Sequence, residues 1–256
     1  MWDLYGESFN SRLLLGTSRY PSPQVMQEAI KASNVEIITV SLRRESAGNS
    51  DGKRFWDFVK NLDLKILPNT AGCFSVGEAV TTAHLARDLF ETDWIKLEVL
   101  GDRLMLHPDP SGTVEAAKEL VGEGFKVFPF ITEDLVVAKR LVDLGCEVLM
   151  PWGAPIGTGQ GILNPFALDM IRKTFPSISL ICDAGIGRPS DALQAMELGF
   201  DGVLLNTAVS TSDDPVSMAS AFAKAVEAGD LAYHAGVMTK RSIAIASSPF
   251  EGLADL

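Results

Sequence analysis

The stretch Trp94-Ile95-Lys96-Leu97-Glu98-Val99 decides how this chain folds, because it places two charges within an apolar strand. Successive side chains of a strand point to opposite faces, so the three aliphatic side chains share one face and Lys96 and Glu98 share the other. A strand with one solvated face would explain this alternation without any function. A strand covered on both faces would instead bury a lysine with a carboxylate, which is costly without a purpose.

Strand and helix patterns alternate along the rest of the chain. Eight short apolar runs predict strands at Arg12–Leu15, Val35–Leu42, Lys65–Leu67, Trp94–Leu100, Lys126–Ile131, Glu147–Trp152, Ser179–Cys182 and Gly202–Leu205. Helical spacing is clearest at Ser75–Leu89, Thr113–Val121, Glu133–Leu144, Pro189–Leu198 and Pro215–Ala228. Strict alternation implies a parallel sheet with right-handed crossovers. Eight repeats predict an α/β fold of the closed (β/α)8 TIM-barrel type.

Helix boundaries and domain organisation agree with this prediction. Ser75 is followed three residues later by Glu78, which is the spacing of a capping box. Gly145 and Gly199 follow helical runs, where a C-terminal glycine is favoured. The length of 256 residues suits one barrel. We therefore expect a single domain over residues 1–256, with residues 246–256 as a flexible or partner-docking tail.

The barrel prediction changes the interpretation of Lys96. Parallel strands are covered on both faces, so the aliphatic side chains would pack under the helices and Lys96 and Glu98 would face the barrel interior. Active sites of this fold lie at the C-terminal ends of the strands, and Glu98 is close to such an end. A buried lysine is readily shifted toward its neutral amine, the form that attacks carbonyl groups.

The overall charge restricts the partners. A formal net charge of −11 argues against nucleic acid or an anionic membrane as the main partner, because both need clustered basic residues. A phosphorylated small molecule remains compatible, since backbone N–H groups can hold a phosphate. The N-terminal segment has no long apolar run, so we expect neither a signal peptide nor a membrane span, and a cytoplasmic location.

Cysteine and histidine usage predicts reduced thiols and no metal site. The cysteines are odd in number and far apart, which is typical of a reducing compartment: Cys73, Cys146 and Cys182. The histidines lack the close spacing of zinc ligands: His84, His107 and His234. We therefore expect no metal and no organic cofactor.

Glycine-rich turns follow the sixth and seventh predicted strands. The segment Pro151–Gly161 contains Gly157, Gly159 and Gly161, a loop rich in backbone donors that suits an anion. It lacks the spacing of a dinucleotide fingerprint, and a simple crossing loop explains it almost as well. The segment Asp183–Ser190 begins with a carboxylate at a strand end, where a general acid or base could sit. Capping of the next turn is also a common role for aspartate.

The turn after the eighth strand, Asn206-Thr207-Ala208, completes this arrangement. Loops after strands seven and eight form the recurrent phosphate site of TIM barrels, often at a helix N-terminus. A lysine, two carboxylates and a phosphate cradle are typical of Schiff-base chemistry on a phosphorylated keto sugar. Two earlier turns, Leu15–Tyr20 and Pro68–Cys73, could line the barrel mouth or simply feed helices. Arg43 and Arg44 could contact an anionic ligand or a neighbouring subunit.

Five segments together resemble the signature segments of bacterial thiazole synthase. They are Leu67–Cys73, Trp94–Val99, Gly153–Gly159, Asp183–Gly187 and Leu205–Ala208, and the likeness extends from about Leu13 to Pro249 in the same order and spacing. The resemblance implies a barrel enzyme of thiamine biosynthesis that condenses 1-deoxy-D-xylulose 5-phosphate with dehydroglycine. Sulfur would come from the C-terminal thiocarboxylate of a small ubiquitin-like sulfur-carrier protein, and dehydroglycine from a glycine oxidase or a radical tyrosine lyase.

The resemblance also implies roles for individual residues. The family's imine-forming lysine falls on Lys96, and its acid/base carboxylates fall on Glu98 and Asp183. Its phosphosugar-binding positions fall on five residues: Gly157, Ala184, Gly185, Asn206 and Thr207. The chain departs from the family at Ser18, where the family usually has glycine, and at Trp152, where leucine is more usual.

The expected mechanism begins with attack of neutral Lys96 on the sugar ketone. The protonated imine acts as an electron sink, so Glu98 and Asp183 can shuttle protons and the carbonyl can migrate along the sugar. Glu98 favours the charged ammonium whereas burial favours the amine, and we expect burial and proton exchange to supply the amine. A class I aldolase-type lyase and a non-catalytic phosphosugar-binding subunit are the alternatives. A barrel that docks a partner is expected to be a homo-oligomer, either a dimer or a tetramer.

Overall fold

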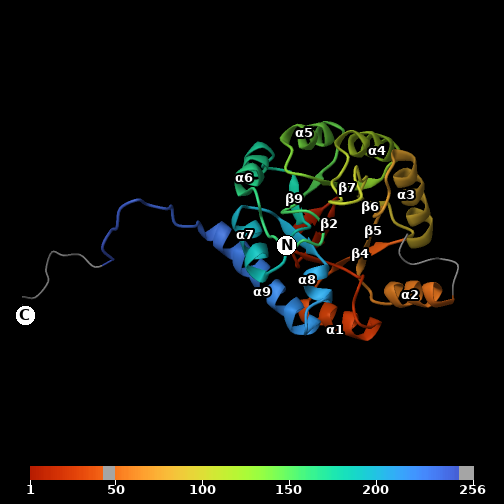
Figure 1. Ribbon diagram of the computed structural model, residues 1–256, viewed down its shortest axis with the longest axis horizontal. Coiled ribbons are helices and arrows are strands. Elements are labelled where there is room, and N and C mark those ends of the chain that lie inside the picture. Colours follow the sequence, from red (N-terminus) through yellow and green to blue (C-terminus); the bar gives the residue numbers. More distant parts are fainter. Residues whose placement is uncertain (43–49, 248–256) are drawn as a thin grey trace, which may run out of the picture.

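A closed barrel of eight parallel strands forms the body of the molecule, in the order β10-β3-β4-β5-β6-β7-β8-β9. The computed structural model describes residues 1–42 and 50–247, and for residues 50–54 only the helical backbone. Helices form a ring around the strands (Figure 1). The predicted (β/α)8 TIM barrel is therefore confirmed. Arg43, Arg44 and residues 248–256 of the predicted tail lie outside the described residues.

The elements have the following bounds. The barrel strands are β3 (Leu13–Gly16), β4 (Ile37–Ser41), β5 (Lys65–Asn69), β6 (Trp94–Leu97), β7 (Lys126–Ile131), β8 (Val148–Pro151), β9 (Ser179–Asp183) and β10 (Gly202–Leu205). The helices are α1 (Pro23–Ser33), α2 (Ser50–Lys60), α3 (Val76–Phe90), α4 (Pro110–Gly122), α5 (Leu135–Asp143), α6 (Pro165–Thr174), α7 (Pro189–Glu197), α8 (Thr207–Ser210) and α9 (Pro215–Ala235).

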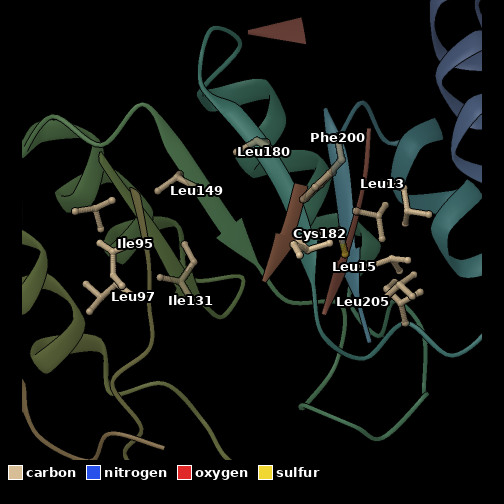
Figure 2. Close-up of a cluster of buried hydrophobic side chains, with 14 of the residues drawn as sticks. Leu13, Leu15, Ile95, Leu97, Ile131, Leu149, Leu180, Cys182, Phe200 and Leu205 are labelled. Atoms are coloured by element: carbon tan, nitrogen blue, oxygen red, sulfur yellow. The ribbon is translucent and has the colours of Figure 1, made fainter. Parts of the chain in front are cut away.

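Side chains alternate between two separate cores, as the pattern of β6 predicts. Ile95 and Leu97 belong to the larger core between the strands and the helices, part of which Figure 2 shows. Trp94 belongs to a second core inside the barrel, together with Phe128 of the neighbouring strand. Because β6 is covered on both faces, the interpretation of Lys96 as a residue on a solvated face is wrong.

A short N-terminal hairpin closes the bottom of the barrel, and the sequence patterns did not predict it. Strands β1 (Trp2–Leu4) and β2 (Glu7–Phe9) pair antiparallel around the turn Tyr5-Gly6, both of whose residues have positive φ. Trp2, Leu4 and Phe9 join the core inside the barrel. The hairpin thus seals the N-terminal end of the barrel with apolar side chains, leaving the C-terminal end as the open mouth.

The predicted cap at Ser75 is present, whereas the last helix ends later than predicted. Ser75 accepts a hydrogen bond from the Glu78 N–H, and the Glu78 carboxylate accepts one from the Phe74 N–H. The last helix, α9, continues beyond its predicted end through Gly229. A Cβ at Gly229 would lie 2.5 Å from the Cβ of Met196. The glycine therefore allows α9 to approach α7 closely, and tertiary packing outweighs its low helix propensity.

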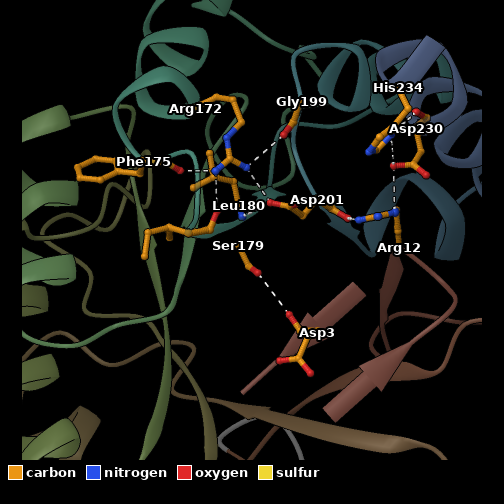
Figure 3. A network of polar contacts seen from close by, with 11 residues as sticks. Asp3, Arg12, Arg172, Phe175, Ser179, Leu180, Gly199, Asp201, Asp230 and His234 are labelled. Carbon is orange, nitrogen blue, oxygen red and sulfur yellow. Dashed lines mark hydrogen bonds and ion pairs between the residues drawn. The ribbon is translucent and has the colours of Figure 1, made fainter. Parts of the chain in front are cut away.

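Arg172 links the segments that lead into the N-terminal ends of β9 and β10 (Figure 3). Its guanidinium pairs with Asp201 Oδ2 at 2.8 Å and donates to the carbonyl oxygens of Phe175, Ile178 and Gly199. The same Asp201 oxygen accepts from the N–H of Leu180. One buried cation therefore donates to three backbone carbonyl oxygens and a carboxylate.

Within residues 1–42 and 50–247, none of the helices combines the length and the apolar character that crossing a bilayer requires.

Candidate active site

Lys96 lies at the centre of a buried cluster of charges. Its Nζ is 2.6 Å from Asp183 Oδ2 and 3.1 Å from Glu98 Oε1, and each of the three side chains is less than a tenth exposed. Lys96 belongs to β6, Glu98 follows directly after that strand, and Asp183 ends β9 on the other side of the barrel. The structure thus brings together the three residues for which the sequence suggests catalytic roles.

The two carboxylates determine the charge of Lys96. Burial alone would lower the pKa of Lys96, but the negative charges of Asp183 and Glu98 outweigh it, so the pKa is raised above its usual range. This direction favours the ammonium over the amine, so the expected supply of amine depends on proton exchange with the carboxylates rather than on burial. The reason is geometric, because two carboxylates within 3.1 Å oppose the desolvation of one cation.

Asp183 responds in the opposite sense. Burial raises the pKa of its carboxyl group to about 6, with Lys96 opposing the shift and Glu98 adding to it. Two carboxylates that share one cation cannot both ionise easily, so one of them takes up a proton more readily than usual. Asp183 lies closer to the lysine and is therefore suited to receive its proton.

Aromatic side chains form one wall of this cluster. Lys96 Nζ lies 5.6 Å from the ring centre of Phe130, which in turn lies 6.4 Å from the ring of Trp152. Trp152 Nε1 donates to Glu133 Oε2 at 2.5 Å. The centre of the Trp152 ring lies 4.7 Å from the centre of the His107 ring. Trp152 therefore connects the loops that follow β6, β7 and β8.

The loop after β9 is held in an unusual backbone conformation. Ala184 and Gly185, which follow the catalytic candidate Asp183, have φ values of 73° and 80°. A Cβ at Gly185 would lie 2.3 Å from the backbone nitrogen of Ala154, so only glycine fits. Left-handed backbone at a non-glycine residue such as Ala184 is strained and clusters at functional sites.

Close packing between loops also requires glycine at position 187. A Cβ at Gly187 would lie 2.5 Å from the carbonyl oxygen of Gly159. The N–H groups of Gly187 and Arg188 already donate to Asp191 Oδ2, so this helix start is occupied by the chain's own carboxylate. Gly157 differs, because it is exposed, has a φ of 75° and would have open space around a Cβ.

Asn206 and Thr207 stand at the start of α8, beside the turn after β3. Asn206 Nδ2 donates to Ser18 Oγ at 2.8 Å, and a Cβ at Gly16 would lie 2.6 Å from the Asn206 Cβ. Among the described residues, no group donates to the buried Asn206 Oδ1. A buried acceptor without a donor is a candidate ligand contact.

The pattern reasoning missed two contributors to this site. Phe130 could have been found from its parity, because it shares the inward face of β7 with Phe128. Thr70 lies in the turn Pro68–Cys73, to which the sequence assigned no definite role. It is fully buried and hydrogen-bonds to the main chain of Glu98. No sequence pattern identifies that contact, since it joins positions 28 residues apart.

Fold and site together define a barrel enzyme with a buried lysine–carboxylate centre at the C-terminal ends of its strands. The model of the family described as "Thiazole biosynthesis protein ThiG" matches residues 3–249. Thiazole synthase of Bartonella quintana (strain Toulouse) is 57% identical over 254 residues, which cover 99% of each chain. Thiazole synthase of Brucella abortus (strain S19) is 57% identical over 256 residues, the whole of both chains.

The chain therefore belongs to the thiazole synthase family of thiamine biosynthesis, and it is a sulfur-transferring enzyme. Among solved structures, one chain of the Amycolatopsis orientalis BexX/CysO complex is similar, with a TM-score of 0.84 and 30% identity. The match covers 94% of this chain and 98% of that one. The family excludes the aldolase and the non-catalytic subunit that the sequence left open as alternatives.

Proposed function

We propose that this enzyme forms an imine between Lys96 and 1-deoxy-D-xylulose 5-phosphate, then combines that sugar with dehydroglycine and sulfur. The observation that carries the proposal is the buried ion-pair cluster, in which Lys96 Nζ lies 2.6 Å from Asp183 and 3.1 Å from Glu98. Burying a cation between two anions has a cost that a purely structural role does not require. Imine formation with a carbonyl substrate requires an amine and adjacent groups that accept protons.

The first step requires a proton to leave Lys96. Asp183 receives it, because its raised pKa of about 6 makes the carboxylate a better base than an ordinary aspartate. The free amine then adds to the sugar ketone, and loss of water gives the protonated imine. The ketone oxygen leaves in that water molecule, so the lysine nitrogen takes its place on the carbon.

The second step is proton removal beside the imine carbon. Glu98 takes the proton, the electron pair of the broken C–H bond forms a carbon–carbon double bond, and the π pair of the imine moves to nitrogen to give an enamine. Return of a proton lets the carbonyl migrate along the sugar. Sulfur then enters from the thiocarboxylate of a small ubiquitin-like carrier protein, dehydroglycine adds, and ring closure with loss of water releases Lys96.

The sugar phosphate would lie across the loops after β8, β9 and β10. The first N–H groups of a helix have no intrahelical partners, so the start of α8 at Thr207 suits the phosphate. The Asn206 Oδ1 is an acceptor and suits a sugar hydroxyl instead. Backbone around Gly157, Ala184 and Gly185 would complete the site. No metal or organic cofactor is needed, because lysine supplies the electron sink.

The wider setting is part of the same proposal. The carrier's tail would enter at the open mouth, a dehydroglycine-forming enzyme would supply the second substrate, and the barrel would assemble as a homo-oligomer. A cytoplasmic location suits buried cysteine thiols such as Cys146 and Cys182.

Borohydride trapping tests the central step. Wild-type protein reduced in the presence of 1-deoxy-D-xylulose 5-phosphate should gain the mass of one reduced adduct, measured on the intact chain. The variant Lys96→Ala should gain none. The control Lys126→Ala, which alters a lysine at the N-terminal end of the neighbouring β7, should still form the adduct. An adduct on the Lys96→Ala protein would contradict the proposal.

A further inference from the structure

Strand β6 ends just before the carboxylate that the proposed mechanism uses. The strand stops at Leu97, and its joint with β5 has a single registered pair, Asn69 with Lys96. On its other side Leu97 is paired with Pro129, which has no N–H to donate. The main chain of Glu98 therefore lies beyond the regular strand pairing on both sides.

The side chain of Thr70 takes over where that pairing ends. Thr70 Oγ1 accepts from the Glu98 N–H at 2.8 Å and donates to the Glu98 carbonyl oxygen at 2.7 Å. The Thr70 N–H donates to the carbonyl oxygen of Lys96 at 3.1 Å. Thr70 is fully buried, so water does not replace these contacts. One threonine thus satisfies both main-chain polar groups of Glu98 and also holds the residue that bears the amine.

We propose that Thr70 is a positioning residue that holds Glu98 in register with Lys96 for proton transfer. This inference rests on the proposed function of those two residues. Thr70 does not touch the reacting atoms and acts through the main chain of Glu98. Loss of its hydroxyl leaves a buried donor and a buried acceptor without partners, and Glu98 shifts to satisfy them. Lys96 remains held by Asp183, so imine formation should suffer less than the proton transfer that follows.

The experiment measures the two steps separately with 1-deoxy-D-xylulose 5-phosphate alone. Borohydride trapping reports the imine, and solvent deuterium incorporation beside the imine carbon reports proton transfer. We expect Thr70→Val to form the adduct while deuterium incorporation falls on the order of 100-fold, the usual effect of a 1 Å misplacement. Thr70→Ser keeps the hydroxyl and should stay within about threefold of wild type, since only a methyl group is lost.

Two further variants separate positioning from a general structural effect. Thr113→Val removes another fully buried threonine hydroxyl, for which residues 1–42 and 50–247 provide no hydrogen-bond partner, and should leave both readouts unchanged. In a Glu98→Gln background the Thr70→Val substitution should cause little further loss, because two residues that act as a unit are not additive. If Thr70→Val does not fold, Thr70→Ala removes the same hydroxyl without placing a methyl group against the Glu98 N–H.

Normal deuterium incorporation by a folded Thr70→Val protein would overturn the role of Thr70 alone. An equal loss in Thr70→Ser, or an undiminished loss in the Glu98→Gln background, would do the same. A wild-type protein that gives neither adduct nor exchange would instead overturn the proposed function, and this inference with it.

Discussion

Alanine substitution at two glycines with nearly equal φ separates backbone strain from steric overlap in the loops above the site. Gly157 and Gly185 have φ values of 75° and 80°, so an alanine at either position pays the same left-handed penalty. They differ in space, because a Cβ at Gly157 meets nothing within 4 Å. A Cβ at Gly185 would lie 2.3 Å from the nitrogen and 2.5 Å from the Cβ of Ala154.

The expected magnitudes follow from that difference. Gly157→Ala should cost about 1 kcal/mol, the penalty of left-handed backbone for an L-residue. Gly185→Ala adds overpacking against atoms that cannot rotate away, for a total of roughly 3–5 kcal/mol. In a chain of this length the first change lowers Tm by about 2–4 °C and the second by on the order of 10 °C.

Thermal unfolding followed by circular dichroism, with urea midpoints as a second measure, checks this prediction. Both proteins are compared with wild type at equal concentration, because an oligomer would make Tm depend on concentration. Equal losses for the two variants would refute the reasoning. They would mean that the loop after β9 does not press against Ala154, and that only its backbone conformation requires glycine.

Three other predictions concern the site, its wall and the base of the barrel. The initial rate of adduct formation should rise with pH through about 6, because a protonated Asp183 cannot accept the proton of Lys96. The variant Asp183→Asn should lose this inflection in the pH profile. An unchanged pH profile in that variant would exclude Asp183 as the proton acceptor. Trp152→Leu should lower the free energy of unfolding by roughly 2 kcal/mol, since it removes ring contacts and leaves Glu133 without its indole donor. Trp152→Phe keeps a ring and should lower the free energy of unfolding by less. The reverse order of urea midpoints would contradict this prediction. Arg172→Lys should lower the free energy of unfolding by about 2 kcal/mol, because an ammonium cannot reproduce the planar guanidinium that reaches Asp201 and the neighbouring carbonyls. Borohydride trapping at Lys96 should be unchanged. Loss of the adduct in a folded variant would show instead that the N-terminal end of the barrel influences the site at its C-terminal end.

Hydrophobic periodicity predicts the barrel but not the hairpin that closes it. Each barrel strand has apolar residues that must be covered on both faces, and that requirement is visible in the local pattern. Strands β1 and β2 have three residues each, too few for a periodic signal, and are stabilised by packing against the barrel interior. The end of α9 is mispredicted for the same reason. Gly229 has a low helix propensity, but it lies inside α9 because of its close contact with α7.

The sequence by itself determined where Lys96, Glu98 and Asp183 lie, because strand parity and loop order place all three at one end of the barrel. Only the tertiary structure decided in which direction the pKa of Lys96 is shifted. The pKa of Lys96 depends on the balance between burial and two carboxylates within 3.1 Å, one of them 87 positions away along the chain. It likewise decided that Thr70 holds Glu98, because hydrogen bonds between separate strands depend on distances that no sequence pattern contains.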